Sequence, residues 1–352
     1  MREARNYPDF RVDALALALA PGVGPRGYGE RANAFGSPAH AFAATVPAGS
    51  QSRLRDDALR AIADGERRGA RFLMLGDSDY PASFLELGDP PPFLFILGDL
   101  SRITQPAVAI VGTRRATSYG ERVTTALSGA LASAGATIVC GMARGIDAAA
   151  HRAALACGGI TVAVLGTGVD VAYPVAHRSL HRAIEERGVV ISEFPCGTRA
   201  APGSFPRRNR LIAALTRMTL VIEAGEKSGA LITADHATDL GRDIAAVPGQ
   251  VDSPQSMGSN KLIRDGVHAV LSASDALSLV GLADPSTRRD ITPSLHGDER
   301  AIWIALADGA MAIDLLTECA ELTPRRALAA VTALELGDLI DTLPTGELRR
   351  RR

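Results

Sequence analysis

The chain has 352 residues, of which 46% are hydrophobic, and its formal net charge at pH 7 is −1. A chain of this length is expected to form two or three domains, each with a core of its own. The balanced charge excludes a protein that holds nucleic acid through a basic field over its whole surface, so an anion site would have to be local. No apolar run reaches the roughly 18 residues of a membrane span, and the first residues lack the apolar segment of a signal peptide. We therefore expect a cytoplasmic protein with no membrane contact.

Residues 1–75 are predicted to form a small N-terminal helical domain. Residues 12–35 have the pattern helix, Gly/Pro hairpin, helix, and residues 52–70 form a further helical stretch. Gly22 and Gly24 could let the hairpin backbone approach a phosphate, as in helix-hairpin-helix modules, or could make a tight turn between packed helices. The tight turn is favoured. An extended segment, residues 79–100, leads into the next domain.

Residues 76–283 are predicted to form a doubly wound α/β domain with a mostly parallel sheet. Short apolar runs alternate here with helix-sized segments, which is typical of strands buried on both faces of a sheet. Crossover connections would place helices on both sides. The first crossover helix is marked by Ser118 and Glu121, which have the spacing of a capping box. The predicted strands are 107–111, 137–140, 160–165, 189–192, 218–223, 243–247 and 268–271.

The C-terminal part is predicted to be a separate module. Residues 284–298 are rich in Pro, Ser and charge and are expected to be a linker. Residues 299–348 have the layout of a small winged-helix-like domain, with helices over 313–320 and 324–336 and then a short ribbon. Arg325 and Arg326 are the only basic residues of the last helix. A protein contact or a structural role is therefore favoured there over reading of duplex DNA.

The ends of the predicted strands carry the candidate ligand site, because ligands of an open parallel sheet bind beyond the carboxyl ends of its strands. Glycines follow four of these strands, at positions 112, 141, 166 and 225. Ordinary strand-to-helix turns would also need glycine. An anion site is favoured, since helix-start N–H groups and Arg side chains are good phosphate donors. The polar side chains of these loops are Thr113, Arg114, Arg144, Lys227 and Ser228.

Signatures of a cofactor or a metal site are absent from the sequence, and we expect neither. The first loop reads GTRRAT instead of the GxGxxG fingerprint for dinucleotides, and there is no GxxxxGK[ST] loop for ATP. The four cysteines are scattered and are expected to be small buried hydrophobes.

Candidate catalytic groups are equally few. Glu193 and Glu223 end two strands and could be paired carboxylates, but a role as counter-charges that hold Arg144 or Arg210 is favoured. Asp147 and His151 are interpreted as a helix-start cap and an ordinary surface pair.

The stretch FPRRNRLIAALT, residues 205–216, places Arg207, Arg208 and Arg210 near the start of a predicted helix, and no Asp or Glu occurs between 194 and 222. The helix macrodipole makes cations unfavourable at that end. If Asn209 caps the helix, a bound phosphate would make the arrangement attractive. Phe205 could be a core residue or a platform for a stacked base, and stacking is favoured because it complements a basic groove.

Seven segments resemble, in the same order, the DNA processing protein A family (DprA, also called Smf). The resemblance covers about residues 79–272 and extends more loosely to both ends. It implies an extended Rossmann-like fold and a non-enzymatic protein that binds single-stranded DNA. It further implies a homodimer, with residues 258–271 near the interface, that protects incoming DNA during natural transformation and loads the RecA recombinase onto it. The segments are IVGTRRATSYG, GMARGIDAAAHRAAL, VAVLGTGVDVAYP, ISEFPCG, FPRRNRLIAALT, VIEAGEKSGALITADHATDLGRDIAAVPG and GSNKLIRDGV.

The family's motifs can be carried over residue by residue. A Gly-Ser/Thr-Arg motif falls on residues 112–114, a Phe-Pro-x-Arg-Asn-Arg block on 205–210, and a Ser-Gly-x-Leu-x-Thr block on 228–233. The residues expected to bind DNA are Gly112, Thr113, Arg114, Arg115, Arg144, Phe205, Arg207, Arg208, Asn209, Arg210, Lys227, Ser228 and Gly229.

The alternative is a nucleotide-binding or nucleotide-hydrolysing enzyme of the wider Rossmann-like superfamily. Phosphoribohydrolases of that group carry a PGGxGTxxE segment. The corresponding region here reads EAGEKSGALIT, without the acid at the expected place. The enzyme is therefore the weaker hypothesis.

Overall fold

The fold is taken from a computed structural model, which describes residues 8–283, 295–306, 309–337, 339–343 and 345–350. The chain divides into two compact units, Met1–Pro285 and Ser286–Arg352. Most of the predicted linker, residues 284–294, lies outside the described residues.

The first unit is built on a nine-stranded sheet with the order β1-β2-β6-β5-β4-β3-β7-β8-β9. All seven predicted strands are present, and they run parallel to one another. The strands β3 to β7 are wholly buried, which explains why they are continuous apolar runs. Both residues of β9 and the first residue of β8 are exposed. Their bounds are β3 Ala107–Val111, β4 Thr137–Cys140, β5 Thr161–Leu165, β6 Val189–Ser192, β7 Met218–Val221, β8 Asp243–Ala246 and β9 His268–Ala269.

Two further strands, β1 (Arg71–Met74) and β2 (Phe93–Gly98), extend the sheet beyond β6. They pair antiparallel with each other, and β2 pairs antiparallel with β6. The sequence indicated only an extended segment in this region. Because β1 belongs to the sheet, the sheet begins at Arg71, a few residues before the predicted boundary at residue 76.

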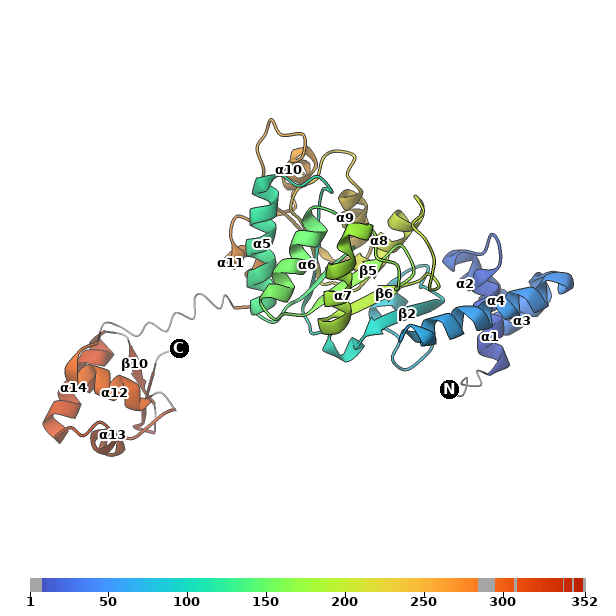
Figure 1. Ribbon diagram of the computed structural model, residues 1–352. Coiled ribbons are helices and arrows are strands. Elements are labelled where there is room, and N and C mark those ends of the chain that lie inside the picture. Colours follow the sequence, from blue (N-terminus) through green and yellow to red (C-terminus); the bar gives the residue numbers. More distant parts are fainter. Residues whose placement is uncertain (1–7, 284–294, 307–308, 338, 344, 351–352) are drawn as a thin grey trace. The chain divides into compact units, whose positions relative to one another are not determined.

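The order of the strands reverses between β3 and β7. From β3 the chain proceeds through β4 and β5 to β6 on one side, and then returns to β7, β8 and β9 on the other side. Helices α5 (Ser118–Ser133), α6 (Ile146–Ala156) and α7 (Arg178–Arg187) lie on one face of the sheet, and α8 (Ser204–Ala214) and α9 (Gly229–Asp239) on the other (Figure 1). The reversal creates a switch point, where ligands of doubly wound sheets bind.

Helix α5 begins one residue earlier than the capping-box spacing indicated. Its N-cap is Thr117, whose Oγ1 accepts a hydrogen bond from the backbone N–H of Gly120. Ser118 is the first helical residue. Thr117 is also tied to the sheet, because its backbone N–H and its hydroxyl both donate to the Glu223 carboxylate. Glu223 therefore holds this helix start and makes none of the expected contacts with Arg144.

From residue 8 onward, four helices precede the sheet: α1 (Asp9–Leu19), α2 (Pro25–Ala34), α3 (Pro38–Thr45) and α4 (Ala48–Arg67). The helix–hairpin–helix pattern is thus present, whereas α3 was not expected. Apolar residues of these helices, such as Leu15 and Phe42, share a core with Phe72 and Phe95 of β1 and β2. That residues 1–75 form a domain able to fold alone stays a prediction.

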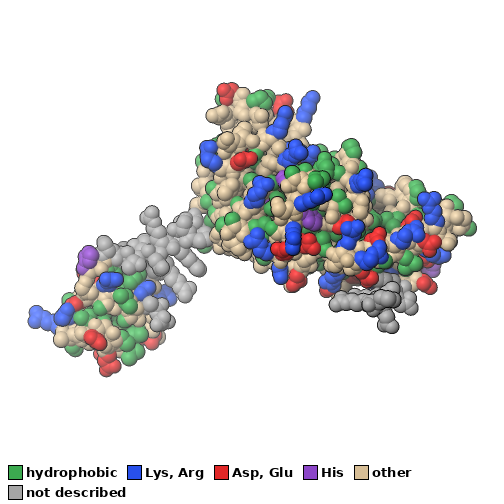
Figure 2. All heavy atoms as spheres, in the orientation of Figure 1, with side chains coloured by type: hydrophobic (Ala, Val, Ile, Leu, Met, Phe, Trp, Pro, Cys, Tyr) green, Lys and Arg blue, Asp and Glu red, His purple; other side chains and the backbone are tan. Residues whose placement is uncertain are grey.

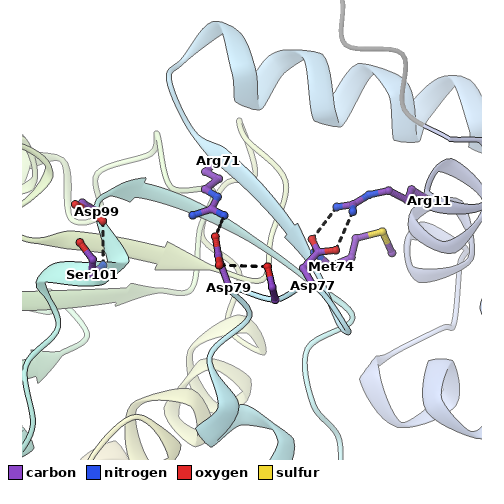
Figure 3. Close-up of polar contacts among 8 residues, drawn as sticks. Arg11, Arg71, Met74, Asp77, Asp79, Asp99 and Ser101 are labelled. Carbon is purple, nitrogen blue, oxygen red and sulfur yellow. Dashed lines mark hydrogen bonds and ion pairs between the residues drawn. The ribbon is translucent and has the colours of Figure 1, made fainter.

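A bidentate ion pair joins these helices to the sheet. Figure 3 shows Arg11 of α1 reaching Asp77 in the turn after β1, with both nitrogen–oxygen distances at 2.8 Å. Asp77 also accepts a hydrogen bond from the backbone N–H of Met74. Burial raises the pKa of Asp77, but the hydrogen bonds from Arg11 and Met74 and the charges of Arg11 and Arg71 outweigh it, so the pKa lies below its ordinary value.

The second unit has the expected winged-helix layout. It contains α12 (Gly297–Ala305), α13 (Ile313–Cys319), α14 (Pro324–Leu336) and an antiparallel ribbon of β10 (Ile340–Thr342) and β11 (Leu348–Arg350). Ile302, Leu316 and Leu334 belong to a core of its own. Of the two basic residues of α14, Arg326 is paired with Asp298.

Candidate functional site

A hollow of about 830 Å³ lies at the carboxyl edge of the sheet, where the strand order reverses. The loop after β3 contributes Gly112 to Arg114, and the loop after β7 contributes Gly225 and Lys227 to Gly229. Helix α8 contributes Phe205, Arg208 and Asn209. The loops on either side of the switch point therefore line one hollow.

A second hollow of about 530 Å³ adjoins the first. It is lined by the loop after β4, with Gly141, Ala143 and Arg144, and by residues 173–176 of the loop after β5. The two hollows share five lining residues and so lie side by side; we call the two together the depression. The shared residues are Arg114, Ala143, Tyr173, Phe205 and Arg208.

The structure brings together all but two of the residues that were expected to bind DNA. Those that line the first hollow, the second or both are Gly112, Thr113, Arg114, Arg115, Arg144, Phe205, Arg208, Asn209, Lys227, Ser228 and Gly229. Arg207 and Arg210 line neither hollow.

Both of these arginines contact Glu193 instead. Arg210 Nη2 donates to Glu193 Oε2 at 2.6 Å, and Arg207 Nη2 donates to the same oxygen at 3.1 Å. Arg210 and Glu193 are buried. Glu193 is thus the counter-charge of Arg210, one of the two roles considered for it, and this geometry does not support the expected phosphate contact of Arg210.

The predicted start of helix α8 is wrong. The helix begins at Ser204, so Asn209 lies inside it and cannot cap it. Pro206 is tolerated here because backbone N–H groups in the first turn of a helix have no acceptor within the helix, so the N–H that proline lacks is not missed. The Asn209 side chain instead donates to the Gly229 carbonyl at 3.2 Å and so links α8 to the start of α9.

Arg208 lies at the base of both hollows with only 4% of its surface exposed. Its guanidinium donates to the Val164 carbonyl and to the Asn209 side chain. Burial, and then the charge of Arg114, lower its pKa to about 10, although Asp147 opposes the shift. Arg208 is thus a buried cation, and its side chain forms no ion pair in the part of the chain that the structure describes.

Asp147 and His151 are not a surface pair. Both are buried, and each has a different partner. Asp147 accepts hydrogen bonds from the backbone N–H groups of Gly141 and Ala143, so it shapes the loop that carries Arg144. His151 Nδ1 lies 2.7 Å from the Thr161 hydroxyl.

Four exposed cations surround the depression: Arg114, Arg115, Arg144 and Lys227. None of them forms an ion pair within the described ranges. Figure 2 shows that basic and acidic side chains both occur across the visible face of the first unit, so this group is a local feature rather than part of a basic field. Such a group attracts an anion with several charges.

The backbone of the loop after β3 is largely engaged in its own structure. The Thr113 N–H donates to the Glu223 carbonyl at 2.7 Å, and the Arg115 N–H donates to the Thr113 hydroxyl. A ligand in the first hollow would therefore meet mainly side-chain donors at this loop, and fewer backbone donors than the glycine pattern indicated.

Tyr173 is the site residue that sequence reasoning missed. It follows β5, is 43% exposed and lines both hollows. Its ring centroid lies 5.3 Å from that of Phe205. The signal was present in the segment GTGVDVAYP. Tyr173 is the one aromatic residue of this segment, which follows the carboxyl end of β5.

Neither a metal centre nor a membrane span occurs among the described residues. They contain no group of three or more His, Cys, Asp or Glu side chains placed to hold a metal ion. Within the same ranges no helix is long and apolar enough to cross a membrane.

A mostly parallel sheet with a cationic, aromatic-lined depression at its switch point defines a Rossmann-like protein with a candidate site for an anionic ligand. Residues 71–281 match the family model of DNA recombination-mediator protein A, and residues 286–346 match the DprA winged helix domain. The chain belongs to this family, DprA or Smf.

Relatives agree with this assignment. The chain is 39% identical over 307 residues to protein Smf of Synechocystis, covering 82% of this chain and 76% of that protein. It is 40% identical over 294 residues to a putative DNA processing protein DprA of Mycobacterium tuberculosis, covering 78% and 76%.

Two solved structures have the same fold. DNA processing protein A from Streptococcus pneumoniae superimposes with a TM-score of 0.67 at 31% identity, covering 77% of this chain and 98% of that one. DNA processing protein A from Helicobacter pylori, a structure that describes its single-stranded DNA binding mode, superimposes with a TM-score of 0.53 at 31% identity, covering 59% and 94%.

Proposed function

We propose that this protein binds single-stranded DNA in the depression at the switch point, protects incoming DNA, and loads RecA recombinase onto it during natural transformation. The observation that carries the proposal is the combination of four exposed cations with two aromatic rings around the depression. Cations attract the phosphates, and rings offer stacking surfaces to bases.

A single strand fits this combination better than a duplex. In a duplex both faces of every base are already stacked, so exposed rings such as Tyr173 have no base to contact. In a single strand the bases can rotate onto aromatic side chains while the backbone follows the cations. The relative from Helicobacter pylori binds this same type of ligand.

The proposed contacts divide into two kinds. Arg114, Arg115, Arg144 and Lys227 contact phosphates, which carry no sequence information, so binding tolerates many sequences. Phe205 contributes an aromatic side chain to the lining of both hollows, and the buried Arg208 adds a positive charge there. Gly112, Thr113, Asn209, Ser228 and Gly229 shape the first hollow.

Hydrolysis of a nucleotide is less well supported, because the three buried acids near the strand ends, Glu193, Glu223 and Asp147, are engaged. Glu193 contacts two arginines, and Glu223 accepts from Thr117. Asp147 lines the first hollow but accepts two backbone hydrogen bonds. Burial also raises its pKa, although the charge of Arg208 opposes this shift.

The protein is also proposed to act as a homodimer through the sheet unit. Residues 258–271 were expected near the interface, and exposed apolar side chains occur in and beside this segment, at Leu271 and Met257. Sedimentation at tens of micromolar tests the dimer, and a monomer mass independent of concentration would exclude it. Stimulation of RecA filament formation on coated single strands tests the loading step.

The binding proposal is tested with one fluorescent oligodeoxythymidylate and a duplex of the same length. We expect the single strand to bind more tightly than the duplex, with an affinity that falls as salt increases. A parallel assay for hydrolysis of nucleoside monophosphates tests the enzymatic alternative. Equal affinity for both DNAs, or nucleotide hydrolysis without oligonucleotide binding, would overturn the proposal.

A further inference from the structure

The two aromatic rings of the depression differ in how much surface they offer to a ligand. Tyr173 is 43% exposed, whereas Phe205 is only partly exposed. Phe205 also has two neighbours already: the Arg114 guanidinium carbon lies 5.2 Å from its ring centroid, and the Tyr173 ring lies 5.3 Å away. Tyr173 is therefore the more accessible of the two aromatic residues.

A base cannot insert between these two rings. Their centroid separation of 5.3 Å and interplanar angle of 34° are those of aromatic rings in direct contact. Phe205 thus supports the Tyr173 ring and places Arg114 beside it. A base would have to stack on the part of Tyr173 that faces away from Phe205.

The second hollow has the composition that one nucleotide needs. Tyr173, Pro174, Val175 and Ala176 form an apolar side, on which Val175 is 61% exposed. Arg114, Arg115 and Arg144 contribute the cationic side. A base can bury its face against the apolar side while its phosphate meets the arginines.

We infer that Tyr173 is a base-stacking residue and that the second hollow holds a nucleotide next to those in the first hollow. The strand then crosses the Tyr173–Phe205 pair, with Arg114 between the two subsites. This inference rests on the proposed binding of single-stranded DNA. It adds to that proposal the course of the strand across the two hollows and a residue, Tyr173, whose contact requires a base.

The matched variants separate stacking from a merely structural role. Tyr173→Leu keeps an apolar side chain but removes the ring, and Tyr173→Phe keeps the ring. Tyr119→Leu is the control, since Tyr119 is also exposed, at 38%, but lies outside both hollows. Each full-length variant is titrated with oligodeoxythymidylate and with an abasic oligonucleotide of the same length.

Tyr173→Leu should lose roughly 5- to 150-fold in affinity for the thymidylate strand, the range of one lost base stack. Its affinity for the abasic strand should stay within about twofold of wild type, as should both affinities of Tyr173→Phe and Tyr119→Leu. An equal loss for both oligonucleotides would show that Tyr173 only supports the site, and no loss for either would show that it is not involved. Both results overturn the inference while leaving the proposed function intact.

A second readout tests direct contact. A strand containing 5-iododeoxyuridine is irradiated with the wild-type protein, and the crosslinked peptides are identified by mass spectrometry. Adducts on the peptide that contains Tyr173 support the inference, whereas adducts confined to the peptide that contains Phe205 overturn it. Absence of any wild-type binding to the thymidylate strand would overturn the proposed function and this inference together.

Discussion

Arg210 and Glu193 form a buried ion pair, with Arg210 Nη2 donating to Glu193 Oε2 at 2.6 Å. The pair joins α8 to the loop after β6 and engages Arg210 outside both hollows. Burial raises the pKa of Glu193, although both arginines oppose this shift. The carboxylate therefore depends on its cationic partners to stay ionised.

The first prediction concerns this pair. Arg210→Ala should destabilise the first unit by about 3–5 kcal/mol, the cost of leaving a buried charge without its partner. We expect the lower end, because Arg207 still contacts Glu193. Urea unfolding followed by circular dichroism measures the loss.

The control for this prediction replaces both charges. The double variant Arg210→Met, Glu193→Leu should recover much of the stability, since apolar pairs often substitute for buried ion pairs without loss. If Arg210→Ala were as stable as wild type but bound single-stranded DNA more weakly, Arg210 would contact the ligand after all.

The parallel strands were predictable from the sequence because burial on both faces of a sheet requires a continuous run of apolar residues. The run at 107–111, for example, is wholly apolar and forms the buried β3. The strands β1 and β2 were missed because they join the sheet only through the antiparallel pairing of β2 with β6, which lies about a hundred residues further on. Periodicity carries no information about such a partner.

The site was predictable only in part for a similar reason. Loop glycines and arginines identified the depression, because parallel strands bring their carboxyl ends to one edge. The start of α8 was not identified, because its N-cap residue is Gly203, which has no side chain to cap the helix. The sequence also could not separate Arg210, which is paired, from Arg114, which is exposed, because that difference depends on distances across the fold.

A second prediction tests the phosphate contact of Arg114 by its salt dependence. Each phosphate contact contributes about −0.7 to the slope of log affinity against log salt. Arg114→Ala should flatten the slope by about this amount for every DNA sequence alike, since phosphates carry no sequence information. Titrations at three salt concentrations measure it. Arg207→Ala is the matched control and should leave the slope unchanged; an unchanged slope in Arg114→Ala would mean that this loop is only a turn.

A third prediction follows from the buried His151. Burial, and then the charges of Arg208, His177 and Arg152, lower its pKa from 6.5 to about 3. Between these two values the unfolded chain binds one proton more than the folded chain. This contribution to stability is therefore complete above pH 6.5 and is lost as the pH falls toward 3, by about 1.4 kcal/mol for each pH unit.

Unfolding of His151→Gln at pH steps from 7 to 4 tests this. The slope of its unfolding free energy against pH should be smaller than that of wild type, by the amount that corresponds to one bound proton. His268→Gln is the control, because His268 is exposed, and should behave as wild type. Fluorescence of Trp303, which lies in the second unit, reports that unit separately. Parallel curves for wild type and His151→Gln would contradict the assignment of a neutral buried histidine.

The last prediction concerns which of the two units binds single-stranded DNA. Every residue of the proposed DNA site precedes residue 235, and the first unit has hydrophobic clusters separate from that of the second. Removal of residues 286–352 should therefore leave the affinity for oligodeoxythymidylate within about twofold, because the first unit keeps every residue of the site. The truncated chain should also keep the salt slope of the full chain, since it retains Arg114, Arg115, Arg144 and Lys227. A folded truncated chain with most of its affinity lost would instead move the main contact to the winged helix, where Arg325 would be the first residue to replace.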